Sequence, residues 1–382
     1  MSKNCLSDNI KRYRIAKQLT QVDLANMLYV APQTVSKWEK GITVPDVDKI
    51  CVMADILGVS VDNLVRGNFA NGQEAMLAID GGGTKTAFVL FGKDGKVFEY
   101  LTLGGSNPNT YGLDHAKKVL REGIDSLISR GYRVKFGYAG ISGASVGENK
   151  SELDSFLNSS YPFIKFRVDG DIHNIIHSAG NIEKCIGVIS GTGSVAYGYD
   201  GKELHRAGGW GYLFDEAGSG FDIGRDLFRY CLACEDGVAD KTELYYKVCE
   251  TVGCPVFDNL SVIYGKGKDY VASFSPLIFE FYCKGDSTAI EIVNKTVCRL
   301  AELVIQVSIR YDCGSDVVIS GGLATGSDLL CDLLNEKLDN RFKVIVPKMP
   351  PLYGAAIKCM KFFGEKFDYN TFESNFREGL KK

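Results

Sequence analysis

Three things that this 382-residue sequence lacks narrow its class before any motif is considered. It has no apolar run long enough to cross a membrane and no signal peptide, so we expect a cytoplasmic protein with no membrane partner. Neither sign of charge dominates, because the formal net charge is −3, which argues against a protein that coats nucleic acid along its whole length. Residues 1–70 carry nine Lys and Arg against seven Asp and Glu, a balance that only permits a DNA-binding segment.

The twelve cysteines lack the dense, regular spacing of a disulfide framework, so we expect reduced thiols. One CxxC pair, Cys231 and Cys234, lies in a predicted helix and has no second pair at zinc-site spacing. We interpret this pair as part of an apolar core, with metal binding as the alternative.

What the sequence does contain is glycine at the ends of apolar strands. The run MLAIDGGGTKT at 76–86 predicts a buried strand that ends at Asp80, a glycine turn, and a returning strand at 87–91. Glycines let backbone N–H groups approach an anion closely, and Asp80 suits a hydrated Mg²⁺. The predicted phosphate-binding residues of this turn are Gly81, Gly82, Gly83, Thr84 and Lys85. The alternative is a tight hairpin turn with a solvated carboxylate.

Two further apolar strands end in the same way. The stretch 186–201 predicts a strand, a turn and a returning strand, and 317–330 predicts a strand, the pair Gly321 and Gly322, and a helix. A glycine pair allows a flat base or ribose to lie against the backbone. The two units of strand, glycine turn and returning strand indicate two facing lobes that each offer backbone donors to one polyphosphate, and the second turn contributes Gly191, Thr192, Gly193 and Ser194.

Three other polar or aromatic positions have two interpretations each. Asp171 follows a strand at 163–168 and precedes a helix that begins near Ile172, so on the residues alone a helix cap is favoured over a catalytic base. Trp210, set among glycines before an acidic pair, fits either an aromatic core plug or a carbohydrate platform. Asn107 is a turn former unless a sugar lies nearby.

Residues 1–66 predict a bundle of short helices. Thr20 with Asp23 marks one helix start, and Pro32 marks the next, in which Val35 and Trp38 face inward. Over LTQVDLANMLYVAPQTVSKWEKG and PDVDKICVMADILGVSVDNLV the segment resembles the lambda-repressor-like helix-turn-helix domain. The resemblance implies a recognition helix at 32–39 that contacts DNA through Gln33, Thr34, Ser36 and Lys37. Such domains bind DNA as dimers, so we expect a homodimer; a bundle used for protein contacts is the alternative.

Residues 76 to about 365 resemble the BadF/BadG-type ATPase family and, within it, the N-acetylglucosamine kinases of the actin-like sugar-kinase superfamily. The resemblance rests on IDGGGTKT, GGSNPNTYG, FRVDGDIHN, VISGTGS, GGWGYLFDEAGSGFDIGR, VVISGGLA and MPPLYGAAI, which follow the family's order. It implies a two-lobed, actin-like (ribonuclease H-like) α/β fold that uses ATP and Mg²⁺ to phosphorylate an amino sugar.

The same resemblance implies a role for each candidate residue. Asp80 would lie near Mg²⁺, both glycine turns would hold the ATP phosphates, Gly321 and Gly322 would border the adenosine, and Asp171 would be the catalytic base. The implied sugar-binding residues are Asn107, Gly209, Trp210, Asp215 and Glu216. The family pattern after Trp-Gly contains Gly-Asp-Glu-Gly-Ser, whereas this chain has FDEAGS at 214–219. That difference displaces the acids by one place and leaves open which of them reaches the sugar.

The predicted organisation is a helix-turn-helix domain at 1–66, a linker at 67–75, lobe I at 76–185, and lobe II at 186–382, with a C-terminal helix packed back on lobe I. We predict ATP-dependent phosphorylation of an N-acetylglucosamine-like hexosamine at its 6-hydroxyl by a kinase that carries a DNA-binding domain, and we expect this kinase to act as a sugar-responsive regulator. One alternative is a catalytically silent, sugar-sensing transcription regulator. Another is an ATPase that activates an iron–sulfur dehydratase, although no cysteine lies beside the glycine motifs in a recognisable cluster pattern.

Overall fold

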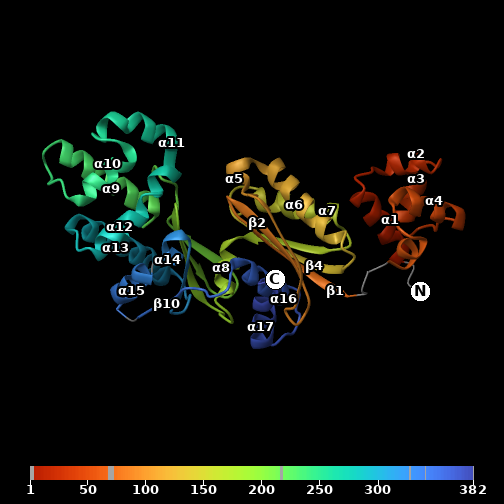
Figure 1. Cartoon of the computed structure of the whole chain (residues 1–382). Coiled ribbons are helices and arrows are strands. Elements are labelled where there is room, and N and C mark those ends of the chain that lie inside the picture. Colours follow the sequence, from red (N-terminus) through yellow and green to blue (C-terminus); the bar gives the residue numbers. More distant parts are fainter. Residues whose placement is uncertain (1–3, 68–72, 216–217, 327, 340, 382) are drawn as a thin grey trace. The chain divides into compact units, whose positions relative to one another are not determined.

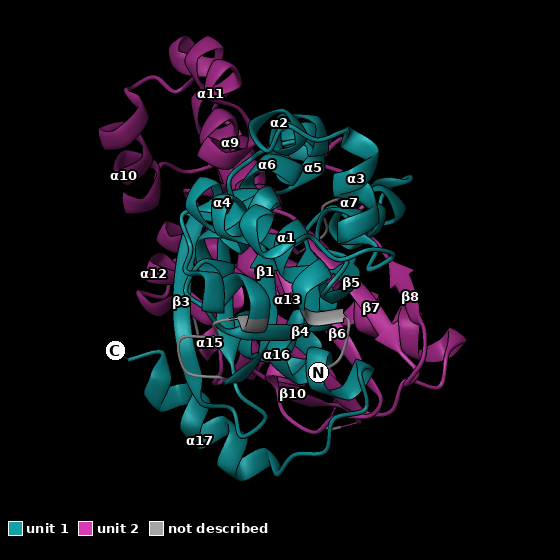
Figure 2. Ribbon diagram, turned by 90° about the vertical axis from the view of Figure 1, so that its right-hand side faces the viewer, with its two compact units in different colours: residues 1–177, 351–382 teal, residues 178–350 magenta. Residues whose placement is uncertain are grey.

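The chain divides into two compact units, each built on its own five-stranded sheet. Unit 1 comprises residues 1–177 and 351–382, and unit 2 comprises residues 178–350 (Figure 2). The computed structural model describes residues 4–67, 73–215, 218–326, 328–339 and 341–381 (Figure 1). Among these residues no helix is long and apolar enough to cross a membrane.

The N-terminal part of unit 1 is a helical bundle. Its elements are α1 (Asn4–Ala16), α2 (Gln21–Met27), α3 (Pro32–Glu39), α4 (Val47–Leu57) and a π-helical turn (Asn63–Gly67). Thr20 and Asp23 form the reciprocal capping box that starts α2, as their spacing predicts. Val35 and Trp38 are buried with Leu24 in the apolar core of this bundle. The predicted helices of this segment are therefore confirmed.

The sheet of unit 1 has the strand order β3-β2-β1-β4-β5. Its strands are β1 (Glu74–Gly81), β2 (Lys85–Phe91), β3 (Val97–Gly104), β4 (Arg133–Ile141) and β5 (Lys165–Gly170). The first three are antiparallel, whereas β4 and β5 run parallel to β1. Since β1 is apolar on both of its faces, the sheet needs cover on both sides.

Helices α6 (Leu113–Ile128) and α7 (Asn149–Ser160) cover one face of this sheet, where Leu77 and Ile79 join their apolar core. Helix α16 (Pro351–Phe362) packs on β1 and β4 at the other face (Figure 1). Helix α17 (Tyr369–Gly379) follows it, and Phe372 contacts Phe91 edge to face at 5.8 Å. The remaining helices of unit 1 are α5 (Pro108–Tyr111) and α8 (Ile172–Ser178), whose last residue already belongs to unit 2.

The sheet of unit 2 repeats this plan with the order β10-β9-β6-β7-β8. Its strands are β6 (Cys185–Ser190), β7 (Ser194–Tyr199), β8 (Leu204–Ala207), β9 (Asp316–Ser320) and β10 (Lys343–Ile345). Its helices are α9 (Gly220–Glu235), α10 (Glu243–Val252), α11 (Leu260–Ala272), α12 (Ser275–Cys283), α13 (Ser287–Arg310), α14 (Gly322–Gly326) and α15 (Asp328–Lys337). A short 3₁₀ turn, Phe257–Asn259, precedes α11. Cys231 and Cys234 lie on α9 in the apolar core of this unit, as predicted.

The structure differs from the predicted boundaries at three places. The helical periodicity of residues 111–128 predicts one helix that starts at residue 111, but Gly112 adopts φ 85° and separates α5 from α6. The two units separate after His177, rather than at the predicted 185/186. Strand β1 begins inside the predicted linker at Glu74, whose carboxylate pairs with Lys135 at 2.6 Å, and residues 68–72 of that linker lie outside the described part of the chain.

Candidate functional site

The first glycine turn connects β1 to β2 and leaves its tip exposed. The Gly82 amide donates to the Lys85 carbonyl at 2.9 Å, and the Ser106 amide donates to the Gly82 carbonyl at 3.0 Å. A Cβ on Gly81 would lie 2.5 Å from both Ile141 Cδ1 and the Ser106 hydroxyl, so a larger residue there would force these buried side chains to move. Gly83, Thr84 and Lys85 are exposed, which leaves a hydroxyl and an ammonium group free to meet an anion at the turn.

Asp80 lies at the end of β1 and is held by Asn174 of α8. The Asn174 amide nitrogen donates to Asp80 Oδ1 at 2.7 Å and to the Gly140 carbonyl at 3.1 Å. Burial raises the pKa of Asp80 to about 6; the Asn174 hydrogen bond opposes this shift, and the negative charge of Asp171 adds to it. Gly140 makes the arrangement possible, since a Cβ there would lie 2.0 Å from Asn174 Oδ1.

The oxygens at this position fit a divalent cation. Asn174 Oδ1 is buried without a hydrogen-bond partner, which is a costly state for an amide oxygen. Together with the Asp80 carboxylate it offers the hard oxygen donors that Mg²⁺ prefers, and Mg²⁺ takes most of its other ligands from water and phosphate. Asp80 and Asn174 are therefore the residues of unit 1 that suit Mg²⁺.

Asp171 lies between β5 and α8, which begins at Ile172 as the sequence predicts. Burial raises its pKa, while the Ser142 hydroxyl and the Ile172 amide, which both donate to its carboxylate, oppose the shift. Asn107 in turn donates to Ser142 Oγ at 3.4 Å and accepts from the Asn109 amide at 2.9 Å. Asp171 thus combines raised basicity with a fixed orientation, which a general base requires.

The second glycine turn connects β6 to β7 and is fastened to the start of α9. The Gly191 carbonyl accepts from the Gly220 amide at 2.7 Å, and the Thr192 carbonyl accepts from the Phe221 amide at 3.2 Å. Gly321, with φ 106°, packs against the end of β6. A Cβ at this position would approach the carbonyl oxygen of Ser190, the last residue of β6, to 2.3 Å. The fold thus joins two glycine motifs that lie far apart in the sequence.

A cavity of about 520 Å³ opens beside this junction, within the size range of small-molecule sites. Gly191, Thr192 and Gly322 line it, whereas Gly193, Gly321 and Ser194 are not among its lining residues. The rest of its wall comes from the start of α9, from α14, and from α11, α12 and the segment that joins them, with Asp269, Ser275 and Phe279 among the lining residues. The polar and aromatic groups beside glycine backbone give this nucleotide-sized cavity the character of a base and ribose site.

The loop after β8 presents Trp210 to solvent. Its side chain is 64% exposed, and the Arg206 guanidinium lies 4.5 Å from its ring, so the core-plug alternative does not apply. A Cβ on Gly209, where φ is 71°, would lie 2.7 Å from Val195 Cβ. The Asp215 amide donates to the Gly211 carbonyl at 2.8 Å, while Glu216 lies outside the described residues.

Helix α3 carries the predicted DNA-binding residues on its outer face. Gln33 and Lys37 are exposed, and Thr34 and Ser36 are half-buried. With the opposite face of α3 packed into the bundle, these four side chains are available to a groove of DNA.

The sequence did not single out several residues that the fold places at these sites. Asn174, which orients Asp80, is the last residue of the FRVDGDIHN motif, whereas Ser142, which orients Asp171, follows β4 outside the motifs quoted above. Asp269, Ser275 and Phe279 carry no such signal, because the surrounding helices show no glycine motif.

Comparison with known proteins assigns both parts of the chain. Residues 77–357 match the BadF/BadG/BcrA/BcrD ATPase family, and residues 10–64 match a helix-turn-helix family. An N-acetylmuramic acid/N-acetylglucosamine kinase of Clostridium acetobutylicum is 30% identical over 299 residues, which cover 74% of this chain and 97% of that protein.

Two further similar proteins also carry the name of an N-acetylglucosamine kinase. An N-acetyl-D-glucosamine kinase of Dictyostelium discoideum is 28% identical over 316 residues, covering 75% of this chain and 98% of the relative. The crystal structure of a putative N-acetylglucosamine kinase from Chromobacterium violaceum superposes with a TM-score of 0.59 at 21% identity, over 75% of this chain and 99% of that one. This likeness and the match at residues 10–64 together confirm the predicted fold class, an actin-like α/β fold preceded by a helix-turn-helix domain.

Proposed function

Because the chain belongs to the BadF/BadG/BcrA/BcrD ATPase family and carries a helix-turn-helix domain, we propose that it is an ATP-dependent amino-sugar kinase with a DNA-binding domain. The proposed substrate is an N-acetylglucosamine-like hexosamine, phosphorylated at its 6-hydroxyl. The curated relatives named above are kinases of such sugars, which supports this substrate class.

Asp171 is the proposed general base. It accepts the proton of the sugar hydroxyl while that oxygen forms its bond to the γ-phosphorus, and the bond from the γ-phosphorus to the bridging oxygen of ADP breaks. Ser142 and Asn107 keep the carboxylate in position, so Asp171 need not reorganise as the charge moves. This ordered array beside Asp80 is the observation that carries the proposal.

The nucleotide is proposed to bind through the two glycine turns and the cavity of unit 2. The backbone N–H groups of the turns, with Thr84 and Lys85, hold the phosphates, and Gly321 and Gly322 border the adenosine. Mg²⁺ at Asp80 and Asn174 supplies charge neutralisation for the phosphates when bound. The sugar is proposed to contact Asn107, Gly209, the exposed indole of Trp210, Asp215 and Glu216.

The kinase proposal is tested by ATP consumption with a panel of sugars: glucosamine, N-acetylglucosamine, N-acetylmuramic acid, N-acetylmannosamine and glucose. We expect turnover with an N-acetylated hexosamine and little with glucose. Binding of an amino sugar without turnover of any panel member would overturn the kinase and favour a silent sugar sensor. The helix-turn-helix domain is the observation that keeps this second candidate in view.

Magnesium affinity is expected to depend on pH through Asp80. Because the folded-state pKa of Asp80 is raised to about 6, the folded chain binds the proton more tightly than the unfolded chain does. Ionising Asp80 therefore costs stability as pH rises from about 4 to about 6, and Mg²⁺ binding recovers part of that cost. Between pH 5 and pH 7 the ionised fraction, and with it the apparent Mg²⁺ affinity, should rise about tenfold.

This dependence is measured by calorimetric titration of Mg²⁺ in the absence of nucleotide. The Asp80→Asn variant should bind Mg²⁺ more weakly and show a flat profile over the same range. A parent profile as flat as that of the variant would show that Asp80 does not hold the cation.

Lys37 is proposed to neutralise a DNA phosphate. Lys37→Ala is therefore expected to weaken DNA binding to a similar degree on different sequences. It should also reduce the slope of the logarithm of the binding constant against the logarithm of salt concentration by about one. Binding of a labelled duplex at several salt concentrations measures the slope. The matched control is Lys17→Ala, an exposed lysine that lies outside α3. An unchanged slope in Lys37→Ala would remove this residue from the interface.

The fusion of the two parts suggests regulation. We propose that the protein acts as a homodimer and that sugar or nucleotide binding changes the DNA affinity of the paired helix-turn-helix domains. DNA titrations with and without N-acetylglucosamine and ATP test this, and equal DNA affinity in all ligand states would contradict it.

A further inference from the structure

Unit 2 contains a second cavity that the kinase proposal does not use. It has a volume of about 590 Å³ and lies between α9 and α11. Its apolar wall includes Phe221, Phe228 and Leu232 of α9, and Leu260, Ile263 and Val271 of α11. The cavity has the size of a small-molecule site and shares no lining residue with the nucleotide cavity.

The charged residues that line this cavity are all cations. Arg225, Arg229 and Lys268 contribute to its lining, which includes no Asp or Glu. A wall that combines aromatic rings with several cations is complementary to a molecule with an apolar body and an anionic head.

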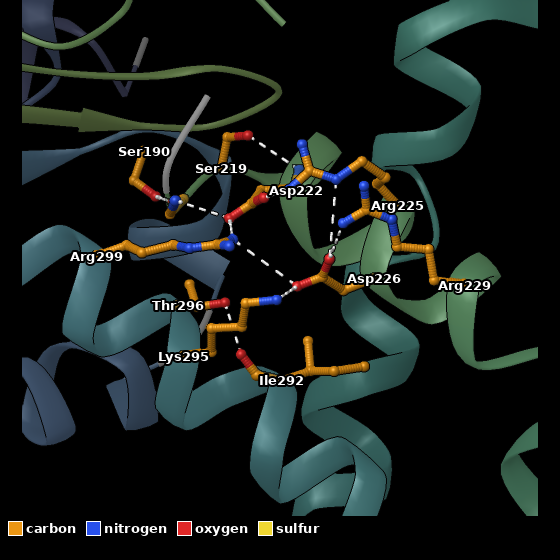
Figure 3. Close-up of polar contacts among 11 residues, drawn as sticks. Ser190, Ser219, Asp222, Arg225, Asp226, Arg229, Ile292, Lys295, Thr296 and Arg299 are labelled. Atoms are coloured by element: carbon orange, nitrogen blue, oxygen red, sulfur yellow. Dashed lines mark hydrogen bonds and ion pairs between the residues drawn. The ribbon is translucent and has the colours of Figure 1, made fainter. Parts of the chain in front are cut away.

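Two of these cations belong to a cluster that is itself unbalanced (Figure 3). Asp222 pairs with Arg225 and Arg299, and Asp226 pairs with Arg225, Arg229, Lys295 and Arg299. Four cations therefore share two carboxylates, which leaves two positive charges in excess. The buried Nε of Arg225 has no hydrogen-bond acceptor, since the Asp226 oxygen is 3.8 Å away. An anionic group in the cavity would supply negative charge to this cluster.

Helices α9 and α11 border both cavities, through different residues. On α11, Lys268 and Val271 line the second cavity, whereas the adjacent Asp269 and Ala272 line the first. A Cβ on Gly224 would lie 2.0 Å from the Val271 carbonyl oxygen, so α9 and α11 are in backbone contact. The first amides of α9 bind the second glycine turn, as described above. A ligand that shifts α9 against α11 therefore acts on the nucleotide cavity.

We propose that the cavity between α9 and α11 binds an amphipathic organic anion and that its occupancy changes the nucleotide affinity of the neighbouring cavity. The second part rests on the nucleotide role proposed above for that cavity. A neutral apolar molecule would not balance the excess positive charge of the cluster, and an inorganic anion would not cover the aromatic walls, so the site favours a ligand that has both an apolar and an anionic part.

Calorimetry on the full-length chain tests the site with three probes: decanoate below its micelle concentration, decylamine, and sulfate. Decanoate should bind at least tenfold more tightly than decylamine, which has the same body and the opposite charge, and more tightly than sulfate. The Arg229→Ala/Lys268→Ala double variant should lose at least tenfold in decanoate affinity. Arg229 is 66% exposed, so its removal leaves the core intact.

The matched control is Arg310→Ala, which removes an exposed arginine at the end of α13 and should leave decanoate binding unchanged. Equal affinities for decanoate and decylamine, or an unchanged affinity in the double variant, would overturn the site.

The coupling is measured separately, as the affinity for ADP with and without saturating decanoate. We expect at least a threefold change in the parent and none in the double variant. An unchanged ADP affinity in the parent would overturn the coupling. Failure of ADP to bind at all would overturn the nucleotide role and with it the coupling, whereas the decanoate titration still decides the site.

Discussion

Replacing Asp171 by asparagine is expected to lower kcat for sugar phosphorylation by about 10²- to 10⁴-fold, the range that a positioned general base contributes. Asparagine keeps the size of the side chain and still accepts a hydrogen bond from Ser142, but it cannot take the proton of the attacking hydroxyl. Stability and nucleotide affinity should change little, because asparagine caps a helix as well as aspartate does. Steady-state kinetics, thermal unfolding and an ADP titration measure the three quantities.

The matched control for this variant is Asp368→Asn. Asp368 caps α17 and accepts from the Thr371 amide at 2.9 Å, so this change removes the charge of a helix cap at a position with no proposed catalytic role. Its turnover should equal that of the parent. If Asp171→Asn also kept turnover within about twofold, Asp171 would be a helix cap and the proposed chemistry would lack its base.

Gly321→Ala is expected to have the second large effect, on both stability and nucleotide binding. At φ 106° an alanine is strained, and its Cβ would lie 2.3 Å from the Ser190 carbonyl oxygen, which is backbone and cannot rotate away. The β9–α14 turn would have to move off the end of β6, at a cost of about 2 kcal/mol or more. Since this junction borders the cavity, ATP affinity should fall at least tenfold. Chemical denaturation and ATP titration measure the two effects.

The chain offers a control at the other end of α14. Gly326 lines the nucleotide cavity, but no atom lies within 4 Å of the position that a Cβ would take there. Gly326→Ala should therefore leave the free energy of unfolding nearly unchanged. A Gly321→Ala variant as stable as Gly326→Ala, with parental ATP affinity, would mean that the contact between the β9–α14 turn and β6 does not shape the site.

Much of the fold was predictable because its signals are local. Thr20 and Asp23 mark a helix start through bonds that span three residues, and each glycine turn follows an apolar strand that the sequence shows directly. The position of Asp171 before α8 depends only on the end of β5 and the start of that helix. The family resemblance then added roles for these residues that their spacing could not supply.

The parts that were not predictable depend on contacts between distant segments. Ser142 reaches Asp171 only because β4 and β5 are parallel neighbours, and Asn174 reaches Asp80 across a gap of 94 positions. The α11 and α12 walls of the nucleotide cavity have ordinary helical sequences, so only tertiary packing assigns Asp269 to it. The exposure of Trp210 likewise follows from how its loop packs, since aromatic side chains occur both in cores and on surfaces.

The central claim, that the chain phosphorylates an amino sugar, is tested most directly by identifying the product. Purified full-length protein is incubated with N-acetylglucosamine, ATP and Mg²⁺, and the sugar is examined by phosphorus NMR. The proposed function predicts stoichiometric ADP and a phosphoester at the 6-hydroxyl, formed about 10²- to 10⁴-fold more slowly by Asp171→Asn under the same conditions. Binding of N-acetylglucosamine without formation of any phosphoester would contradict it and would make DNA binding the principal activity of the protein.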